Sequence, residues 1–262
     1  MTEWTEIAAG VLVRRYAELD LTVGLVLGDA RALVVDTRGD LRQGDELRAA
    51  VREVTARAPE VVLTHGHFDH SFGAVAFRPA PLWAHPGCTR YLRDHAERQR
   101  AEWAAHYRAE QPETADALLR THVVLPDRET TGAELDLGGR VVELRHFGPA
   151  HTDHDLAVLV PDAGAVFAGD LVEHGADPDF EDAVPEGWPA ALDGLLRTGP
   201  EVVVPGHGDP VGVEFVQAQR ADLALLADVV AAVRRGDLSA SDAEAESPFT
   251  AGTTARALRS VH

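Results

Sequence analysis

The sequence contains no lysine and no asparagine, and all 24 of its basic residues are arginine. The missing lysine excludes a Schiff-base mechanism through a lysine side chain. Sites that need a lysine point charge or an asparagine amide donor are excluded in the same way. Cys88 is the only cysteine, so the chain cannot form an internal disulfide.

Long apolar runs and excess positive charge are also missing. No segment approaches the ~18 consecutive apolar residues of a membrane helix. The N-terminal segment MTEWTEIAAGVLVRR lacks the basic start and long apolar core of a signal peptide. The formal net charge of −19 argues against a nucleic-acid partner, which requires a basic surface. We therefore predict a cytoplasmic protein with a small-molecule substrate and no nucleic-acid or membrane partner; its oligomeric state stays open.

The order of predicted elements indicates the fold class. The 262 residues are 45% hydrophobic, which is enough for one large α/β domain. Two strand-rich halves are each accompanied by helices, so two packed sheets with helices on both outer faces fit better than a doubly wound sheet. We predict one domain over residues 1–236, with a helical insertion over 86–122 near the active-site cleft. A polar C-terminal tail over 237–262 is expected to lie on the surface or fray.

The segment VVLTHGHFDH, residues 61–70, places four side chains that can bind metal directly after a strand-like apolar run. His65 and His67 are two residues apart in an extended segment, so they can face one metal ion. Asp69 and His70 follow where the chain turns, so they can face a second ion. Imidazole and carboxylate ligands suit Zn²⁺ or iron.

The same pattern of strand, glycine-containing turn and metal-binding residue recurs three times. VVELRHFGPAH ends at His151, GAVFAGD at Asp170 and EVVVPGH at His207. Two ligand sets follow, and Asp170 can bridge them. The first set is His65, His67 and His151, and the second is Asp69, His70 and His207. Each metal then keeps an open position, as catalytic sites do.

The motifs THGHFDH, GPAHT, FAGD and PGHG, in this order, resemble those of the metallo-β-lactamase superfamily. The resemblance covers nearly the whole chain. It implies the αββα sandwich, which has two mixed β-sheets with helices on both outer faces and a metal cleft at one edge. It assigns the two ligand sets given above, with Asp170 as the bridging carboxylate.

The residue at the bridging position discriminates within this family. True β-lactamases mostly have cysteine or serine there, whereas glyoxalase II and many dinuclear hydrolases have aspartate. Asp170 therefore disfavours an antibiotic lactamase without excluding weak lactam cleavage. The third motif also departs from the common Gly-His-Thr, because Ala150 precedes His151. Nearby, Asp155 is a candidate to orient a ligand histidine, and we interpret His154 as a bystander.

We predict a dinuclear zinc-dependent hydrolase that cleaves an ester, thioester, lactone or amide/lactam bond with a metal-bound hydroxide. Asp69 is the predicted catalytic residue, since it can orient the nucleophile or pass its proton to the leaving group. Two Zn²⁺ ions per chain are expected, with iron or manganese as alternatives. An iron-dependent oxidoreductase of the same fold, similar to persulfide dioxygenase, is the alternative function. A metal-binding module without catalysis is disfavoured by the open positions.

The residues outside these motifs give weaker signals. His174 is the best candidate for the rim of the cleft among the other histidines. The helices of 86–122 form either a lid over the cleft or a structural insertion. Their aromatic residues Tyr91, Trp103 and Tyr107 would contact substrate in the first case, and we favour core positions for them. Cys88 is predicted to be a small buried group.

Overall fold

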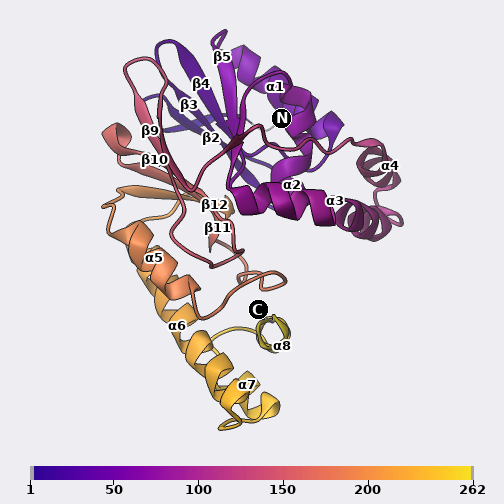
Figure 1. Cartoon of the computed structure of the whole chain (residues 1–262), viewed down its shortest axis with the longest axis vertical. Coiled ribbons are helices and arrows are strands. Elements are labelled where there is room, and N and C mark those ends of the chain that lie inside the picture. The colour runs from indigo at the N-terminus through magenta and orange to yellow at the C-terminus, as the bar shows by residue number, and fades with distance from the viewer. Residues whose placement is uncertain (1–2, 261–262) are drawn as a thin grey trace.

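Two β-sheets form the centre of the protein, whose computed structural model describes residues 3–260 (Figure 1). The first sheet has the strand order β1-β2-β3-β4-β5-β6-β7, and the second has the order β12-β11-β10-β9-β8. The first sheet consists of β1 (Thr5–Ala8), β2 (Val11–Arg15), β3 (Thr22–Leu27), β4 (Arg31–Val35), β5 (Ala58–Val62), β6 (Leu82–Ala84) and β7 (Arg128–Glu129). The second consists of β8 (Gly132–Asp136), β9 (Val141–Arg145), β10 (Ala157–Val160), β11 (Ala165–Glu173) and β12 (Val202–His207).

Parallel pairing in both sheets brings the carboxyl ends of strands to one edge. Strand β4 pairs with β5 in parallel, and β11 pairs with β12 in the same way. Parallel neighbours require a crossover connection, and helices supply it here. Helix α1 (Leu41–Val54) connects β4 to β5, and helix α5 (Trp188–Leu196) connects β11 to β12. Polar segments that follow these four strands therefore meet at the same end of the sandwich.

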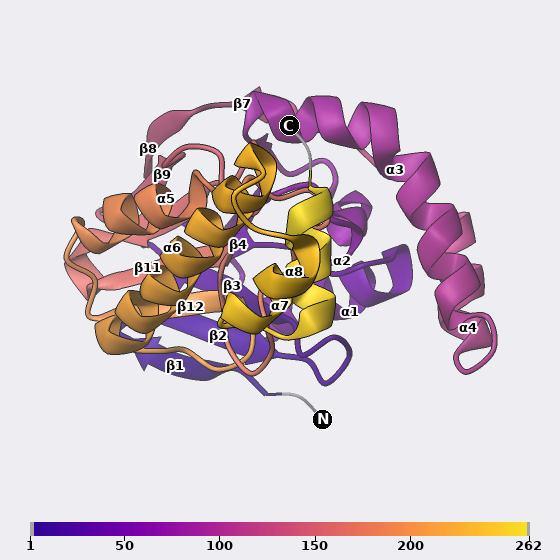
Figure 2. The ribbon, with the colours of Figure 1, turned by 90° about the horizontal axis from the view of Figure 1, so that it is seen from below.

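Helices cover the outer faces of both sheets, as predicted. On the side of the first sheet lie α1, α2 (Phe68–Ser71), the 3₁₀-helix η1 (Phe72–Phe77), α3 (Pro86–Tyr107) and α4 (Pro112–Arg120). On the side of the second sheet lie α5, α6 (Val213–Arg235), α7 (Ala240–Glu246) and α8 (Ala251–Arg259). A single 3₁₀ turn, η2 (Pro161–Ala163), joins β10 to β11. Helices α3 and α4 reach beyond the edge of the sandwich in both views (Figures 1 and 2).

The two sheets and the two outer helix layers make four layers in all. The buried side chains form three clusters, one between each pair of adjacent layers. One cluster lies between α1, η1, α3 and the first sheet, and it includes Leu47 and Phe72. A second lies between the two sheets, where Leu33 of the first sheet and Phe167 of the second are both buried. The third lies between the second sheet and α5, α6 and α8. The predicted αββα sandwich is therefore confirmed.

Local sequence signals explain the start of α1 at Leu41. The carboxylate of Asp40 accepts a hydrogen bond from the Gln43 amide and caps the helix. Leu47 and Val51 then face the core at helical spacing. Helix α4 begins at Pro112, a first-turn position at which proline is favoured.

The C-terminal segment differs from the predicted tail that lies on the surface or frays. After Gly236 the chain forms α7 and α8, and the final residues 261–262 lie outside the described part. The side chains of Ala243, Thr254 and Ala257 are fully buried. Small residues supply this buried face, which explains why hydropathy periodicity did not predict it. Within residues 3–260, no helix combines the length and the hydropathy that crossing a membrane requires.

Replacement of Leu33 by alanine tests the layer between the sheets. Leu33 is 0% exposed, so we expect the free energy of unfolding to fall by about 2–5 kcal/mol through lost burial and the cavity left behind. Leu225→Ala is the control, because Leu225 lies on α6 and is 55% exposed; its effect should stay within about 0.5 kcal/mol. Urea denaturation followed by circular dichroism measures both, and equal losses would contradict the assignment of this layer.

Candidate metal centre

Two histidines and a short helix follow β5 directly. The rings of His65 and His67 meet edge to face, with centroids 4.6 Å apart. Helix α2 begins at Phe68, so Asp69 and His70 lie on its first turn. This turn brings the His70 ring to 4.3 Å from that of His65, measured between centroids. Four side chains within six residues therefore converge, and His65 and His70 are completely buried.

The other three predicted ligands belong to the second sheet. His151 lies in the loop between β9 and β10, and His207 ends β12. We expected Asp170 on a loop after its strand, but it lies within β11. The reason is that β11 continues past Gly169, whose φ is +54°, with irregular pairing to β12. The sandwich edge thus presents ligands from both sheets.

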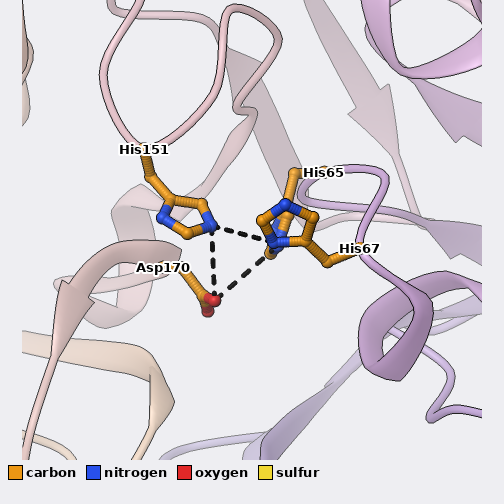
Figure 3. A group of neighbouring side chains, drawn as sticks. All are labelled: His65, His67, His151 and Asp170. Atoms are coloured by element: carbon orange, nitrogen blue, oxygen red, sulfur yellow. Dashed lines mark hydrogen bonds and ion pairs between the residues drawn. The ribbon is translucent and has the colours of Figure 1, made fainter. Parts of the chain in front are cut away.

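The first ligand set closes around a small space, in which its side chains point toward one another (Figure 3). The Nε2 atom of His151 lies 3.1 Å from Nδ1 of His67. The Oδ2 atom of Asp170 lies 3.7 Å from Nε2 of His65 and 3.6 Å from Nε2 of His151. One ligand atom from each of the four residues falls within 4.8 Å of all the others.

The second set lies beside the first and shares Asp170 with it. The Nε2 atoms of His70 and His207 are 3.2 Å apart. The Oδ2 atom of Asp69 lies 3.5 Å from Nε2 of His207 and 3.7 Å from that of His70. Asp170 also reaches this group, with Oδ1 3.2 Å from His70 and Oδ2 3.3 Å from His207. One carboxylate therefore touches both sets.

The atomic environment fits bound cations. Ligand atoms around a tetrahedral zinc ion at about 2.0–2.1 Å lie about 3.3 Å apart, close to the separations found here. Among the described residues, Nε2 of His65 and Oδ1 of Asp170 are buried without a hydrogen-bond partner. Buried polar atoms rarely remain unpaired, so an ion between them accounts for the arrangement. Gly206 permits it, because a Cβ atom there would lie 1.8 Å from Oδ1 of Asp170.

Burial lowers the pKa of the buried imidazoles, and neighbouring charges reinforce this effect at His65 but oppose it at His207. Burial, reinforced by His70, lowers the pKa of His65 well below its usual value. Burial likewise lowers the pKa of His151 to about 4, so both imidazoles are neutral and ready to coordinate. Burial also opposes protonation of His207, but Asp170 outweighs it and raises that pKa to about 10. A cation at the second set must displace this proton.

Asp36 supports the site and was not among the predicted residues. It follows β4 with φ at +63°, an uncommon conformation for aspartate. Its Oδ2 atom lies 2.8 Å from Nδ1 of His70 and accepts a hydrogen bond from the Thr64 hydroxyl. That hydroxyl in turn lies 3.0 Å from Nδ1 of His65. Asp36 thus orients rings of both sets, which is the role that carboxylates behind ligand histidines perform.

Asp155, which we predicted as a candidate for this role, is placed differently. Instead, its carboxylate accepts hydrogen bonds from the Thr152 amide and hydroxyl, at 2.8 and 2.6 Å. The Asp155 side chain therefore stabilises a local turn with Thr152 and is not positioned to orient a histidine ring. His154 lies outside both ligand sets, and its Nε2 atom accepts a hydrogen bond from the Gly66 amide.

Asp182, together with Tyr91, orients the His67 ring, and no sequence motif indicates this contact. The Oδ2 atom of Asp182 lies 3.2 Å from Nε2 of His67 and accepts a 2.6 Å hydrogen bond from the Tyr91 hydroxyl. Burial opposes ionisation of Asp182, but the hydrogen bonds with His67 and Tyr91 hold its pKa below the usual value. Since Nδ1 of His67 faces His151, this bond leaves Nδ1 free to coordinate.

A cleft of about 400 Å³ opens onto the ligand sets. Helix α3 forms one wall with Tyr91, Gln99 and Trp103. Trp103 also packs against the core cluster beside the first sheet, so its predicted core position is confirmed in part, whereas Tyr91 lines the cleft. Tyr107 is buried, in agreement with the prediction. His174 lines the cleft, as predicted for its rim. Cys88 is completely buried, and burial raises the pKa of its thiol.

We expect Asp182→Asn to weaken metal binding at the first set. The amide keeps the size of the side chain but loses the charge that orients His67, and such losses cost about 10–100-fold in metal affinity. Competition with a fluorescent chelator measures the affinity. Asp94→Asn is the matched control, because Asp94 is exposed on α3 and lies outside both sets. Unchanged affinity in Asp182→Asn would contradict a supporting role.

The sequence of this chain is similar to those of known proteins of one family. The profile of the metallo-beta-lactamase superfamily matches residues 19–207. Two proteins named metallo-beta-lactamase type 2 are similar in sequence: one from Bacillus sp. (strain 170) is 27% identical over 192 residues, and one from Bacillus cereus is 26% identical over 193 residues. Each match covers 71% of this chain and 66% of the relative, slightly less than two thirds of its length.

Solved structures show the same fold. A metallo-beta-lactamase from Pontibacter korlensis superimposes with a TM-score of 0.67 at 20% identity, over 85% of this chain and 99% of that one. The metallo-beta-lactamase FIM-1 from Pseudomonas aeruginosa, in a mono-zinc form, gives a TM-score of 0.64 at 19% identity, over 85% and 94%. Fold, motif order and family profile agree: the chain belongs to the metallo-β-lactamase superfamily.

Proposed function

We propose that the protein is a dinuclear zinc-dependent hydrolase that cleaves a carbonyl-type bond in a small molecule. The observation that carries this proposal is Asp170, whose carboxylate lies within 3.7 Å of imidazole nitrogens from both ligand sets. A single-metal site needs no second cluster beside it. Two complete sets that share one buried carboxylate are the arrangement of two-metal hydrolytic sites.

The side chains take the following roles in this proposal. His65, His67 and His151 hold one ion, while Asp69, His70 and His207 hold the other, and Asp170 lies between them. When bound, the ions supply Lewis acidity and lower the pKa of water to near ~7. Asp69 is the acid–base residue, because it lines the cleft and is the ligand-set carboxylate outside the shared position.

The cleft supports a small-molecule substrate. Its volume suits a ligand of drug-like size, and α3 provides aromatic surface for apolar contact. Ester, thioester, lactone and lactam substrates all present a carbonyl to the metal centre. The cytoplasmic location predicted from the sequence is part of the same proposal, as is the choice of zinc.

The alternative is the iron-dependent oxidoreductase similar to persulfide dioxygenase. Such enzymes usually lack a complete second ligand set. In this chain Asp69, His70 and His207 converge within 4.8 Å of one another, which favours the hydrolase. The curated relatives are named for lactam hydrolysis, whereas the aspartate at position 170 and the absence of lysine and asparagine favour other carbonyl substrates.

Metal analysis and a substrate panel test the proposal together. We expect about two equivalents of zinc per chain, because each ligand set is complete. Activity toward at least one ester, thioester, lactone or lactam should disappear with a chelator and return with zinc. Saturation at one equivalent would contradict the dinuclear site. Oxygen consumption with a persulfide in the iron-loaded protein, without hydrolysis, would establish the alternative.

Asp69→Asn distinguishes coordination from proton transfer. The variant keeps one acceptor oxygen but loses the charge and the basicity. For esters with poor leaving groups we expect turnover in fully metallated protein to fall by roughly 10²–10⁴-fold. Activated esters need no proton for the leaving group, so their loss should be smaller. Full recovery with excess zinc would instead assign Asp69 to coordination alone.

A further inference from the structure

The wall of the cleft is strongly acidic beyond the proposed metal ligands. Apart from Asp69 and Asp170, five carboxylates and one arginine line it: Asp20, Glu102, Glu173, Asp179, Glu181 and Arg98. Two of the five have cationic neighbours, since Asp20 pairs with Arg15 at 2.5 Å and Asp179 lies 3.6 Å from Arg256. An anionic substrate would meet repulsion from this wall, with Arg98 as its cationic partner there.

Glu173 is the acid with the most informative environment. Its side chain is buried, with 8% of the residue exposed, and yet it lines the cleft. Its Oε1 atom accepts a hydrogen bond from the Asp179 amide at 3.0 Å. Within the described chain, Oε2 has no hydrogen-bond partner and no ion pair. Unlike Oδ1 of Asp170, this oxygen is not sealed from the cleft, so a ligand bound there can donate a hydrogen bond to it.

Glu181 and Glu102 line the cleft from two different elements. Glu181 lies on the loop between β11 and α5, and Glu102 lies on α3. Burial raises the pKa of Glu181, and the charges of Asp182, Asp179 and Glu102 raise it further. These carboxylates therefore repel one another, and a cation placed among them relieves the repulsion.

An aromatic surface completes the same cleft. The rings of Trp103 and Phe68 stack with centroids 4.3 Å apart and an interplanar angle of 30°. Both residues line the cleft. An ammonium or guanidinium group is attracted by the face of an indole ring, and its alkyl substituents pack against apolar carbon. Carboxylates beside an aromatic face are thus complementary to an organic cation.

We propose that the substrate carries a cationic group, an ammonium or a guanidinium, that docks against Glu173 and Glu181 beside Trp103 while its carbonyl faces the metal centre. The proposal rests on the proposed hydrolase function and names the substrate class for that site. The preference for a cation comes from residues of the wall that take no part in metal binding.

Matched esters test the preference for charge. A choline ester, its neutral 3,3-dimethylbutyl analogue and an anionic hemisuccinate ester differ mainly in the charge of one group. In the zinc-loaded protein we expect kcat/KM to be about five- to tenfold higher for the choline ester than for the neutral one. The anionic ester should be the poorest of the three. This order should weaken as salt concentration rises.

Substitution of the wall carboxylates tests whether they cause the preference for the cationic ester. Glu181→Gln should reduce the ratio of kcat/KM between the choline and neutral esters toward one, and Glu173→Gln should act in the same direction. Glu97→Gln is the matched control, because Glu97 lies on α3 with its side chain 83% exposed and does not line the cleft. Its ratio should equal that of the unmodified protein.

A binding measurement separates the substrate class from the hydrolase function. Calorimetric titration with phenyltrimethylammonium requires no reaction, and we expect binding that Glu181→Gln weakens about fivefold or more. Binding of this kind without turnover of any ester, thioester, lactone or lactam supports the cation site and contradicts the hydrolase. Turnover without a preference for the choline ester, or binding unaffected by Glu181→Gln, overturns the cation site and leaves the hydrolase intact.

Discussion

The convergence of four imidazoles on the buried carboxylate of Asp170 is the interaction on which the site depends. Burying a carboxylate in a protein interior costs several kcal/mol unless opposite charge compensates it. Burial opposes ionisation of Asp170, but His70, His207 and His65 hold its pKa well below the usual value. The side chains come from both sheets, so this compensation also fixes how the two sheets meet at the edge.

Contacts around His207 show how the sheets are held in register there. Its Nδ1 atom lies 2.7 Å from the carbonyl oxygen of Leu19, which precedes β3 of the first sheet. The Thr22 hydroxyl donates a hydrogen bond to the carbonyl oxygen of Gly208 at 2.7 Å. A ligand at the end of β12 is thus positioned by the first sheet. The packing of the two sheets therefore positions a residue of the candidate metal centre.

The residues of the two clusters could be predicted because each belongs to a short motif that begins in a strand. The backbone geometry of VVLTHGHFDH is local, so spacing alone predicted that His65, His67, Asp69 and His70 would cluster. Asp36 and Asp182 were missed because their contacts depend on how distant loops pack. Asp155 was a candidate for this support because it lies near His151 in sequence, but its carboxylate accepts hydrogen bonds from Thr152 instead.

The fold was predictable to the level of layers, because apolar runs mark strands and amphipathic periods mark helices. The role of the C-terminal helices was not predictable in this way. The Thr250 amide, at the start of α8, donates a hydrogen bond to Asp177 at 3.0 Å, and the ring of Phe249 lies 6.0 Å from that of Phe180, measured between centroids. Both contacts involve the loop between β11 and α5.

That loop carries Asp179 and Glu181 of the acidic wall together with Asp182, which supports His67. Arg256 of α8 approaches Asp179 at 3.6 Å and offsets part of its charge. The last helix of the chain therefore contacts a single loop that carries residues of the acidic wall and of the candidate metal centre, although none of its own residues lines the cleft. Because loops are less rigid than strands, the precision of this wall depends on α8 remaining docked. Weaker docking of α8 would disturb the acidic wall and the orientation of His67 together. Asp170 on β11 and His207 on β12 would stay anchored in the second sheet.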